Sequence, residues 1–145
     1  MSAKKIPTKY TEKNQLIDED NFLKAELDMG ISFDNPGFVN LCTSTAQQLK
    51  AYTDIVSVID YGCGTGVYTK ALQGFGYDVI GIEKFQSHRD YISSKAPELN
   101  VHSLDYLNGK HIKVDALFWI ETAEHMTDDE IDVLFEHIEP IYIYF

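Results

Sequence analysis

Residues Val58 to Leu72 read VIDYGCGTGVYTKAL and place three glycines at alternate positions directly after a short apolar run. The run from Ile55 to Asp60 is nearly continuous, which is typical of a strand buried on both faces of a sheet. The segment from Val67 to Gln73 predicts a helix that begins directly after the last glycine. A strand, a glycine-rich loop and a helix therefore follow one another, and the question is what the loop holds.

The rest of the chain repeats this alternation of strands and helices. Strands are predicted over Tyr77–Glu83, Leu99–Ser103, Val114–Ile120 and the final segment IYIYF, and helices over Phe85–Lys95 and after Thr127. Regular alternation implies right-handed crossovers and a mostly parallel sheet with helices on both faces. The predicted fold class is therefore α/β, a three-layer sandwich.

The first 52 residues form an N-terminal extension. Residues 1–20 are predicted as a polar tail or a loosely docked arm, and a short helix is predicted over Asn21–Asp28. The turn segment FDNPGF precedes a longer helix over Phe38–Tyr52. The apolar face expected for this longer helix consists of Phe38, Leu41, Cys42, Leu49 and Tyr52. We expect an arm with helices over residues 1–52, followed by a domain over residues 53–145.

The last helix is marked at both ends. The segment TDDE, from Thr127 to Glu130, is a capping box that also brings three acids to the positive end of a helix. The apolar residues that follow at core-facing spacing are Ile131, Leu134, Phe135 and Ile138. Pro140 is expected to stop the helix, so that IYIYF forms the last strand.

The composition argues against several classes of protein. The chain has 145 residues, which fits one domain, and a formal net charge of −11. Residues 115–139 contain nine acids and no Lys or Arg, which argues against nucleic acid as a partner. The chain has no apolar run of the roughly 20 residues that span a membrane, and no secretion signal at its start. Cys42 and Cys63 form neither a disulfide framework nor a metal motif, so we expect a cytoplasmic protein.

The spacing of the glycines distinguishes between kinds of nucleotide-binding loop. A P-loop requires Lys-Ser or Lys-Thr after its glycines, and neither follows here. The dinucleotide pattern Gly-x-Gly-x-x-Gly is also absent, because counting from Gly62 brings Gly66 one position too early. Asp60 at the strand tip would repel a pyrophosphate and suits a ligand with an ammonium group. The helix that begins after Gly66 would attract a carboxylate.

Two further acids follow later strands. Glu83 ends the second strand, 23 positions after Asp60, where a carboxylate can accept both hydroxyls of a ribose. Asp105 follows the third strand and can accept a hydrogen bond from an adenine amino group, with the ring of Tyr106 over the base. Asp105 equally fits a solvated or helix-capping carboxylate.

The segments VIDYGCGTG, VIGIE and HSLDY resemble the successive cofactor-binding motifs of class I S-adenosylmethionine-dependent methyltransferases. The resemblance covers roughly Ile55 to Phe145 and implies a Rossmann-like sheet with S-adenosylmethionine (SAM) as the cofactor. It implies that the glycine loop lies along the methionine moiety, Glu83 on the ribose and Asp105 near the adenine. The implied cofactor-binding residues are Asp60, Gly62, Gly64, Gly66, Glu83, Asp105, Tyr106 and Glu121.

A second group of polar residues lies in WIETAEHM, just after the fourth strand. Glu121, Glu124 and His125 resemble the metal-binding motif of ubiquinone-biosynthesis O-methyltransferases and of small-RNA terminal 2′-O-methyltransferases. Two carboxylates and an imidazole suit Mg²⁺ or Mn²⁺. The alternative is that these residues only turn the chain into the next helix. His125 is also the best-placed candidate for a catalytic base.

These patterns predict methyl transfer from SAM to an oxygen or nitrogen atom, with a small molecule favoured over nucleic acid as acceptor. The alternative is a non-catalytic module that holds the cofactor or a partner. A nicotinamide oxidoreductase is disfavoured by the glycine spacing and by Asp60. The sheet of the family usually has seven strands, whereas this chain ends on the fifth. We therefore expect an incomplete chain, or an edge strand covered by a partner or by self-association.

Overall fold

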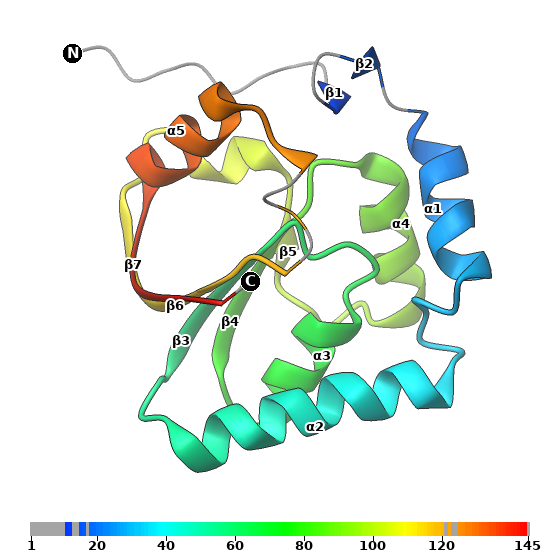
Figure 1. Ribbon diagram of the computed structural model, residues 1–145, viewed down its shortest axis with the longest axis horizontal. Coiled ribbons are helices and arrows are strands. Elements are labelled where there is room, and N and C mark those ends of the chain that lie inside the picture. Colours follow the sequence, from blue (N-terminus) through cyan, green and yellow to red (C-terminus); the bar gives the residue numbers. More distant parts are fainter. Residues whose placement is uncertain (1–10, 13–14, 17, 121, 123–124, 145) are drawn as a thin grey trace.

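The computed structural model of the protein describes residues 11–12, 15–16, 18–120, 122 and 125–144. The main strands are β3 (Ser57–Tyr61), β4 (Asp78–Ile82), β5 (Val101–His102), β6 (Ile112–Phe118) and β7 (Ile138–Tyr144). They form one sheet in the order β5-β4-β3-β6-β7, and every pair of neighbours is parallel (Figure 1). A separate antiparallel pair consists of β1 (Thr11–Glu12) and β2 (Gln15–Leu16).

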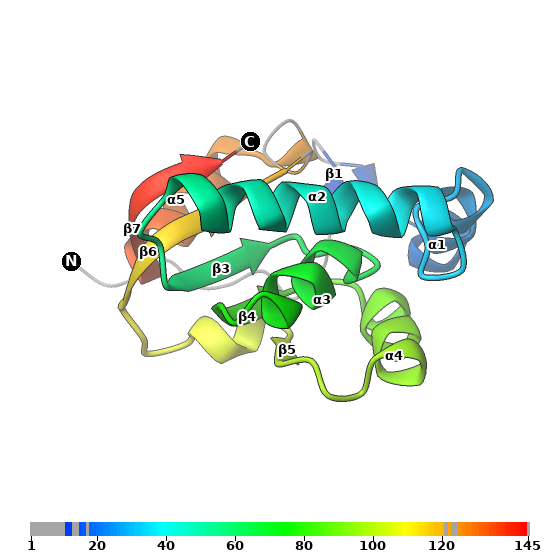
Figure 2. The ribbon, with the colours of Figure 1, turned by 90° about the horizontal axis from the view of Figure 1, so that it is seen from below.

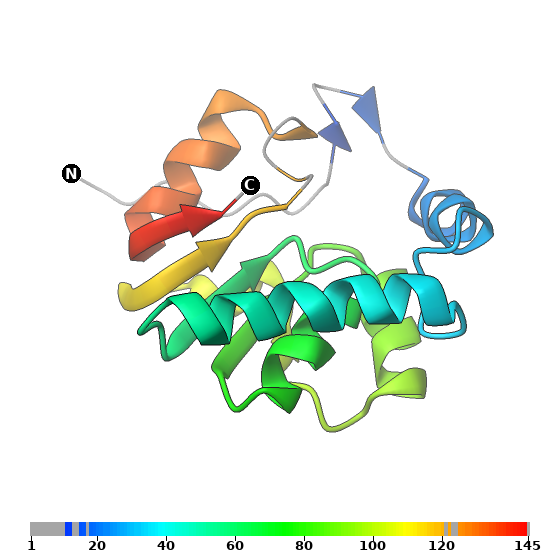
Figure 3. The ribbon, with the colours of Figure 1, turned by 60° about the horizontal axis from the view of Figure 1, so that its bottom comes forward.

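Helices lie on both faces of this sheet. They are α1 (Glu19–Asp28), α2 (Pro36–Tyr52), α3 (Val67–Gly74), α4 (Gln86–Lys95) and α5 (Asp128–His137), with the short 3-10 helix η1 (Leu104–Leu107). Helices α2 and α3 lie beside each other on one face, and α5 lies on the other (Figures 2 and 3). Helix α1 lies beside α4. The predicted α/β class, with its Rossmann-like parallel sheet between helical layers, is confirmed.

The two faces of the sheet follow from the alternation of side chains along each strand. Val58 and Phe118 belong to the apolar cluster that contains residues of α2 and α3. Their chain neighbours Ile59 and Leu117 belong to the cluster that contains residues of α5. Both faces of β3 and β6 are therefore buried, which explains why these strands read as nearly continuous apolar runs in the sequence.

The predicted apolar face of α2 is partly wrong. The buried residues of this helix are Cys42, Ala46 and Leu49, whereas Leu41 is 54% exposed and Tyr52 is 86% exposed. The helix begins at Pro36, and the side chain of Asn35 caps it by accepting the N–H of Gly37. These three buried residues follow one another after four and then three positions and form one narrow inward-facing stripe. Leu41 and Tyr52 fall outside this stripe.

The end of α5 also differs from the prediction. The capping box at Thr127 is present, but the helix ends at His137, and Ile138 is the first residue of β7 instead of part of the helical stripe. Pro140 lies inside β7, opposite Val114 of β6. Proline is tolerated there because β7 is an edge strand, and within the described residues no strand pairs with its outer side.

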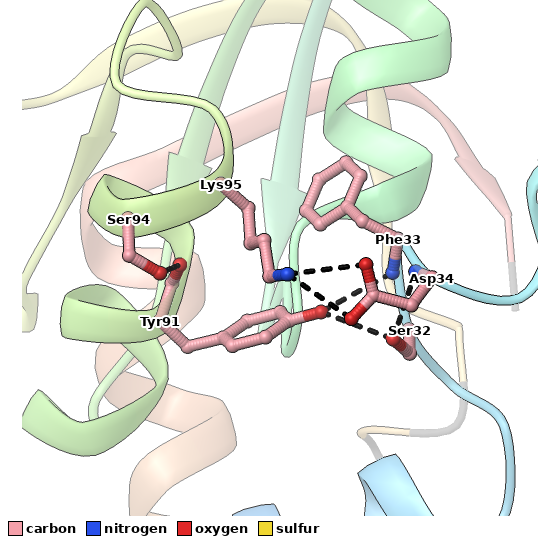
Figure 4. A network of polar contacts seen from close by, with 6 residues as sticks. All are labelled: Ser32, Phe33, Asp34, Tyr91, Ser94 and Lys95. Carbon is pink, nitrogen blue, oxygen red and sulfur yellow. Dashed lines mark hydrogen bonds and ion pairs between the residues drawn. The ribbon is translucent and has the colours of Figure 1, made fainter.

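The segment between α1 and α2 is fixed to α4 by polar contacts (Figure 4). The Tyr91 hydroxyl accepts the backbone N–H of Phe33 and shares a hydrogen bond with the Ser32 hydroxyl, both at 3.2 Å. Lys95 pairs with the carboxylate of Asp34 at 3.0 Å. Because this segment follows α1 directly, these contacts help to hold α1 against the rest of the protein.

Candidate functional site

A cavity of about 480 Å³ lies at the carboxyl ends of β3 and β4. Its walls include the glycine loop between β3 and α3, the segment after β4, and residues of α1 and α2. In open parallel sheets, ligands bind at the carboxyl ends of the strands, at the point where the strand order reverses. Here β4 and β5 lie on one side of β3, and β6 and β7 lie on the other, so the order reverses at β3. The position and size of the cavity therefore fit a ligand of nucleoside size.

The glycine loop has a conformation that other residues would not adopt easily. Gly62 has a φ of 73°, and a Cβ atom there would lie 2.5 Å from the side chain of Thr122. Gly66 has a φ of 83°, and its Cβ atom would lie 2.9 Å from the side chain of Ile92 on α4. The glycines thus permit both the left-handed backbone and the close packing of the loop.

Asp60 lies near the tip of β3 and is only 5% exposed. Its carboxylate accepts a hydrogen bond of 2.8 Å from the hydroxyl of Thr69 on α3. Burial raises the pKa of Asp60 to about 7; the Glu83 charge adds to this rise, and the Thr69 hydrogen bond opposes it. The sequence did not single out Thr69. The sequence signal that could have found Thr69 is its position, nine residues after Asp60, across the loop and in the first turn of α3.

Glu83 follows β4 and is as buried as Asp60. Its two carboxylate oxygens accept the backbone N–H groups of Gly64 and Phe85, each at 3.0 Å. Burial raises the pKa of Glu83, while the nearby His88 and these two N–H donors oppose the rise. Asp60, Glu83 and the glycine loop, predicted separately from the sequence, therefore lie around one cavity.

Asp105 and Tyr106 lie apart from this group. Both belong to η1, Asp105 is exposed, and neither is among the residues that line the cavity. The ring of Tyr106 stacks on His102, with centroids 4.1 Å apart, and Lys110 lies 4.2 Å from the centroid of the Tyr106 ring. Leu104, directly before Asp105, does line the cavity. The predicted adenine contact of Asp105 and Tyr106 thus stays a prediction.

The second predicted group is only partly visible. Glu121 and Glu124 lie outside the described residues, whereas His125 is exposed and lines the cavity. Among the residues that the structure describes, no group of three or more His, Cys, Asp or Glu side chains is arranged to hold a metal ion. The metal site therefore stays a prediction, and so does the cofactor contact of Glu121.

Helix α1 contributes residues that the sequence reasoning missed. Phe22, Ala25 and Glu26 of α1 line the cavity, and so does Met29, directly after the helix. Their spacing of three, four and seven residues from Phe22 places them on one face of the helix. The carboxylate of Glu26 forms a hydrogen bond of 2.7 Å with Nε2 of His88, a fully buried residue of α4. The helical spacing was the signal that could have found them.

Residues 59–139 match the family of methyltransferase domains, and this range is more than half of the chain. The chain belongs to this family. A relative, an uncharacterized methyltransferase of Oceanobacillus iheyensis, is 32% identical over 75 residues, which are 50% of this chain and 35% of the relative. The matched range contains the glycine loop, Glu83 and α5, so much of the cavity lies within the methyltransferase domain.

Two solved structures show the same fold. A SAM-dependent methyltransferase from Archaeoglobus fulgidus is 17% identical with a TM-score of 0.55, and the match covers 82% of this chain and 53% of that chain. A SAM-bound amino pentose methyltransferase from Micromonospora echinaspora, involved in calicheamicin biosynthesis, is 18% identical with a TM-score of 0.51, over 70% of this chain and 46% of that chain. The methyltransferase chain thus spans about a third to a half of the length of the proteins it matches.

Membrane-spanning helices need about 20 mostly apolar residues. In the part of the methyltransferase chain that the structure describes, no helix combines the length and the apolar character that crossing a membrane requires.

Proposed function

We propose that the cavity binds SAM and that the domain transfers the methyl group of SAM to an oxygen or nitrogen atom of a small molecule. The observation that supports this most strongly is the meeting of the glycine loop, Asp60 and Glu83 at one cavity. Membership of the methyltransferase family supports the same cofactor. The amino pentose methyltransferase with the same fold makes a small amine-bearing molecule a reasonable acceptor class to test.

The charge of the cavity favours this cofactor over one that carries phosphates. The described lining contains the acids Glu26, Asp60, Glu83 and Glu130, whereas Lys84 is its one lysine or arginine and lies 4.0 Å from Glu130. A pyrophosphate would meet carboxylates with few cations to balance it. SAM instead carries a positive sulfonium and an ammonium group, both of which a negative cavity attracts.

Each residue has a role in the proposal. Glu83 accepts the ribose hydroxyls, since a carboxylate offers about four lone-pair sites and two are used by backbone N–H groups. Gly62, Gly64 and Gly66 lie along the methionine moiety, and the start of α3 faces its carboxylate. Above about pH 7, where it is ionised, Asp60 adds negative potential beneath the loop. In this proposal Asp105 and Tyr106 contact the adenine and Glu121 contacts the cofactor, and substitution of each residue tests its contact.

When bound, SAM supplies a methyl group on a positively charged sulfur that an acceptor atom can attack. The domain contributes by holding the two molecules in line. His125, exposed at the cavity, takes the proton of the acceptor in this proposal. Alternatively, Mg²⁺ or Mn²⁺ held by Glu121, Glu124 and His125 would orient an acceptor hydroxyl, and His125 would then be a metal ligand and not the base. Equal Mn²⁺ binding by the wild type and by Glu124→Ala would remove the metal from the proposal.

Calorimetric titration with S-adenosylhomocysteine (SAH), the product form of the cofactor, tests the proposal. We expect binding by the wild type and at least about tenfold weaker binding by Glu83→Gln, since one charged acceptor is lost. Glu98→Gln is the control, because Glu98 pairs with Lys70 on the surface and does not line the cavity. Thermal unfolding of each variant shows whether it is folded. No heat with the folded wild type, or equal affinity of the wild type and Glu83→Gln, would refute the proposal.

A further inference from the structure

Helix α1 turns an otherwise apolar face toward the cavity, with one exception. Phe22, Ala25 and Met29 are apolar, whereas Glu26 lies between them on the same face. Asp28, another acid of this helix, instead pairs with Lys24 on the surface. A carboxylate on an inward face costs free energy unless it finds a partner. The position of Glu26 therefore needs an explanation.

One oxygen of Glu26 already has a partner. Oε1 lies 2.7 Å from Nε2 of His88, which packs against the rings of Phe22 and Phe85. Nδ1 of His88 is buried and has no hydrogen-bond partner among the described residues. The ring therefore carries its proton on Nε2, because a carboxylate can only accept and a proton on Nδ1 would have no acceptor. His88 thus donates to Glu26 and holds its side chain in place.

The other oxygen of Glu26 faces the glycine loop. Oε2 lies 3.7 Å from the point that a Cβ atom on Gly64 would occupy, an ordinary van der Waals distance, so this oxygen lies directly beside the loop. The Glu26 side chain is 18% exposed, whereas Asp60 is almost completely buried and bonded to Thr69. Of these two carboxylates, Glu26 is thus the one that a ligand in the cavity reaches more readily.

We propose that Glu26 binds the α-ammonium group of the cofactor, with His88 as the positioning residue behind it. The inference rests on the proposed function, in which the glycine loop carries the amino-acid end of SAM. A carboxylate that is oriented by a buried donor and directed at this loop forms a charge-assisted hydrogen bond with an ammonium group. Helix α1 then belongs to the cofactor site as well as to the wall of the cavity.

The test compares two ligands that differ in the amino-acid group. SAH carries the α-ammonium group, whereas 5′-methylthioadenosine has the same adenosine and sulfur without it. Glu26→Gln keeps an oxygen that can accept from His88 but removes the charge. We expect this variant to bind SAH about tenfold more weakly and 5′-methylthioadenosine with unchanged affinity. Asp28→Asn is the matched control, since it removes a charge from the exposed side of the same helix, and both affinities should be unchanged.

Three results would overturn the inference, and they have different meanings. If Glu26→Gln binds SAH as tightly as the wild type does, Glu26 does not bind the ammonium group, while the proposed function stands. If both ligands lose affinity equally, Glu26 acts through the shape of the cavity and not through this group. If the folded wild type does not bind SAH, the proposed function fails and the inference fails with it.

Discussion

The Glu83 carboxylate accepts the backbone N–H of Gly64 at 3.0 Å, so the residue after β4 is joined directly to the glycine loop after β3. Its other oxygen accepts the N–H of Phe85, just before α4 begins. Glu83 therefore shapes the loop and offers its remaining lone pairs to a ligand. A substitution at Glu83 therefore affects both the shape of the loop and the contact with a ligand. Glu83→Gln keeps the size of the side chain and disturbs the loop less than truncation to alanine does, so it is the better test.

Asp60→Asn should change how stability depends on pH. The pKa of Asp60 is raised to about 7 in the folded protein, so between pH 4 and 7 the folded state binds this proton more tightly than the unfolded state. The wild type thus loses stability progressively as the pH rises from about 4 to about 7, whereas the amide of the variant does not titrate. The free energy of unfolding of the wild type, minus that of the variant, should fall by roughly 2–4 kcal/mol from pH 4 to pH 8.

Urea-induced unfolding at several pH values measures this difference. Because the two proteins differ only at residue 60, most other titrating groups cancel in the subtraction. A difference that does not vary with pH would mean that Asp60 titrates normally in the folded domain, in conflict with its burial.

Gly66→Ala should destabilise the domain more than Gly76→Ala does. Both glycines have a positive φ, 83° and 86°, so both variants lose about 1 kcal/mol or more through backbone strain. A Cβ atom at residue 66 would also lie 2.9 Å from Ile92, whereas at residue 76 nothing lies within 4 Å. We expect an additional loss of roughly 1–3 kcal/mol for Gly66→Ala, measured by urea unfolding. Equal losses for the two variants would contradict the close packing of the loop on α4.

Tyr91→Phe should loosen the segment between α1 and α2. The variant removes the hydroxyl that accepts the N–H of Phe33 and contacts Ser32 (Figure 4). We expect a loss of about 1 kcal/mol in the free energy of unfolding and faster amide hydrogen exchange at Phe33. Tyr52→Phe is the control, because Tyr52 is exposed at the end of α2. Unchanged exchange at Phe33 in Tyr91→Phe would show that the hydroxyl does not hold this segment.

The sequence was sufficient for the parallel sheet because β3 and β6 are buried on both faces and carry a strong apolar signal. The acids Asp60 and Glu83 were also predictable, since the carboxyl ends of neighbouring parallel strands meet at one edge. Pro140 was expected to stop the last helix but lies inside β7. A strand tolerates proline when it is an edge strand, and only the assembled sheet shows which strands lie at an edge. Glu26 was missed for a similar reason: α1 reaches the cavity through contacts with α4, some 60 residues later.

The most direct test of SAM binding at the glycine loop is a titration of the ¹⁵N-labelled domain with SAH, followed by its amide NMR spectrum. We predict saturable shifts of the Gly62, Gly64 and Gly66 amides, because the loop that contains these glycines lines the cavity that would hold the amino-acid end of the ligand. Nicotinamide adenine dinucleotide, which carries a pyrophosphate, should leave these signals in place. Saturation with SAH that moves none of the three glycine signals, or no response to SAH at all, would contradict SAM binding at this loop.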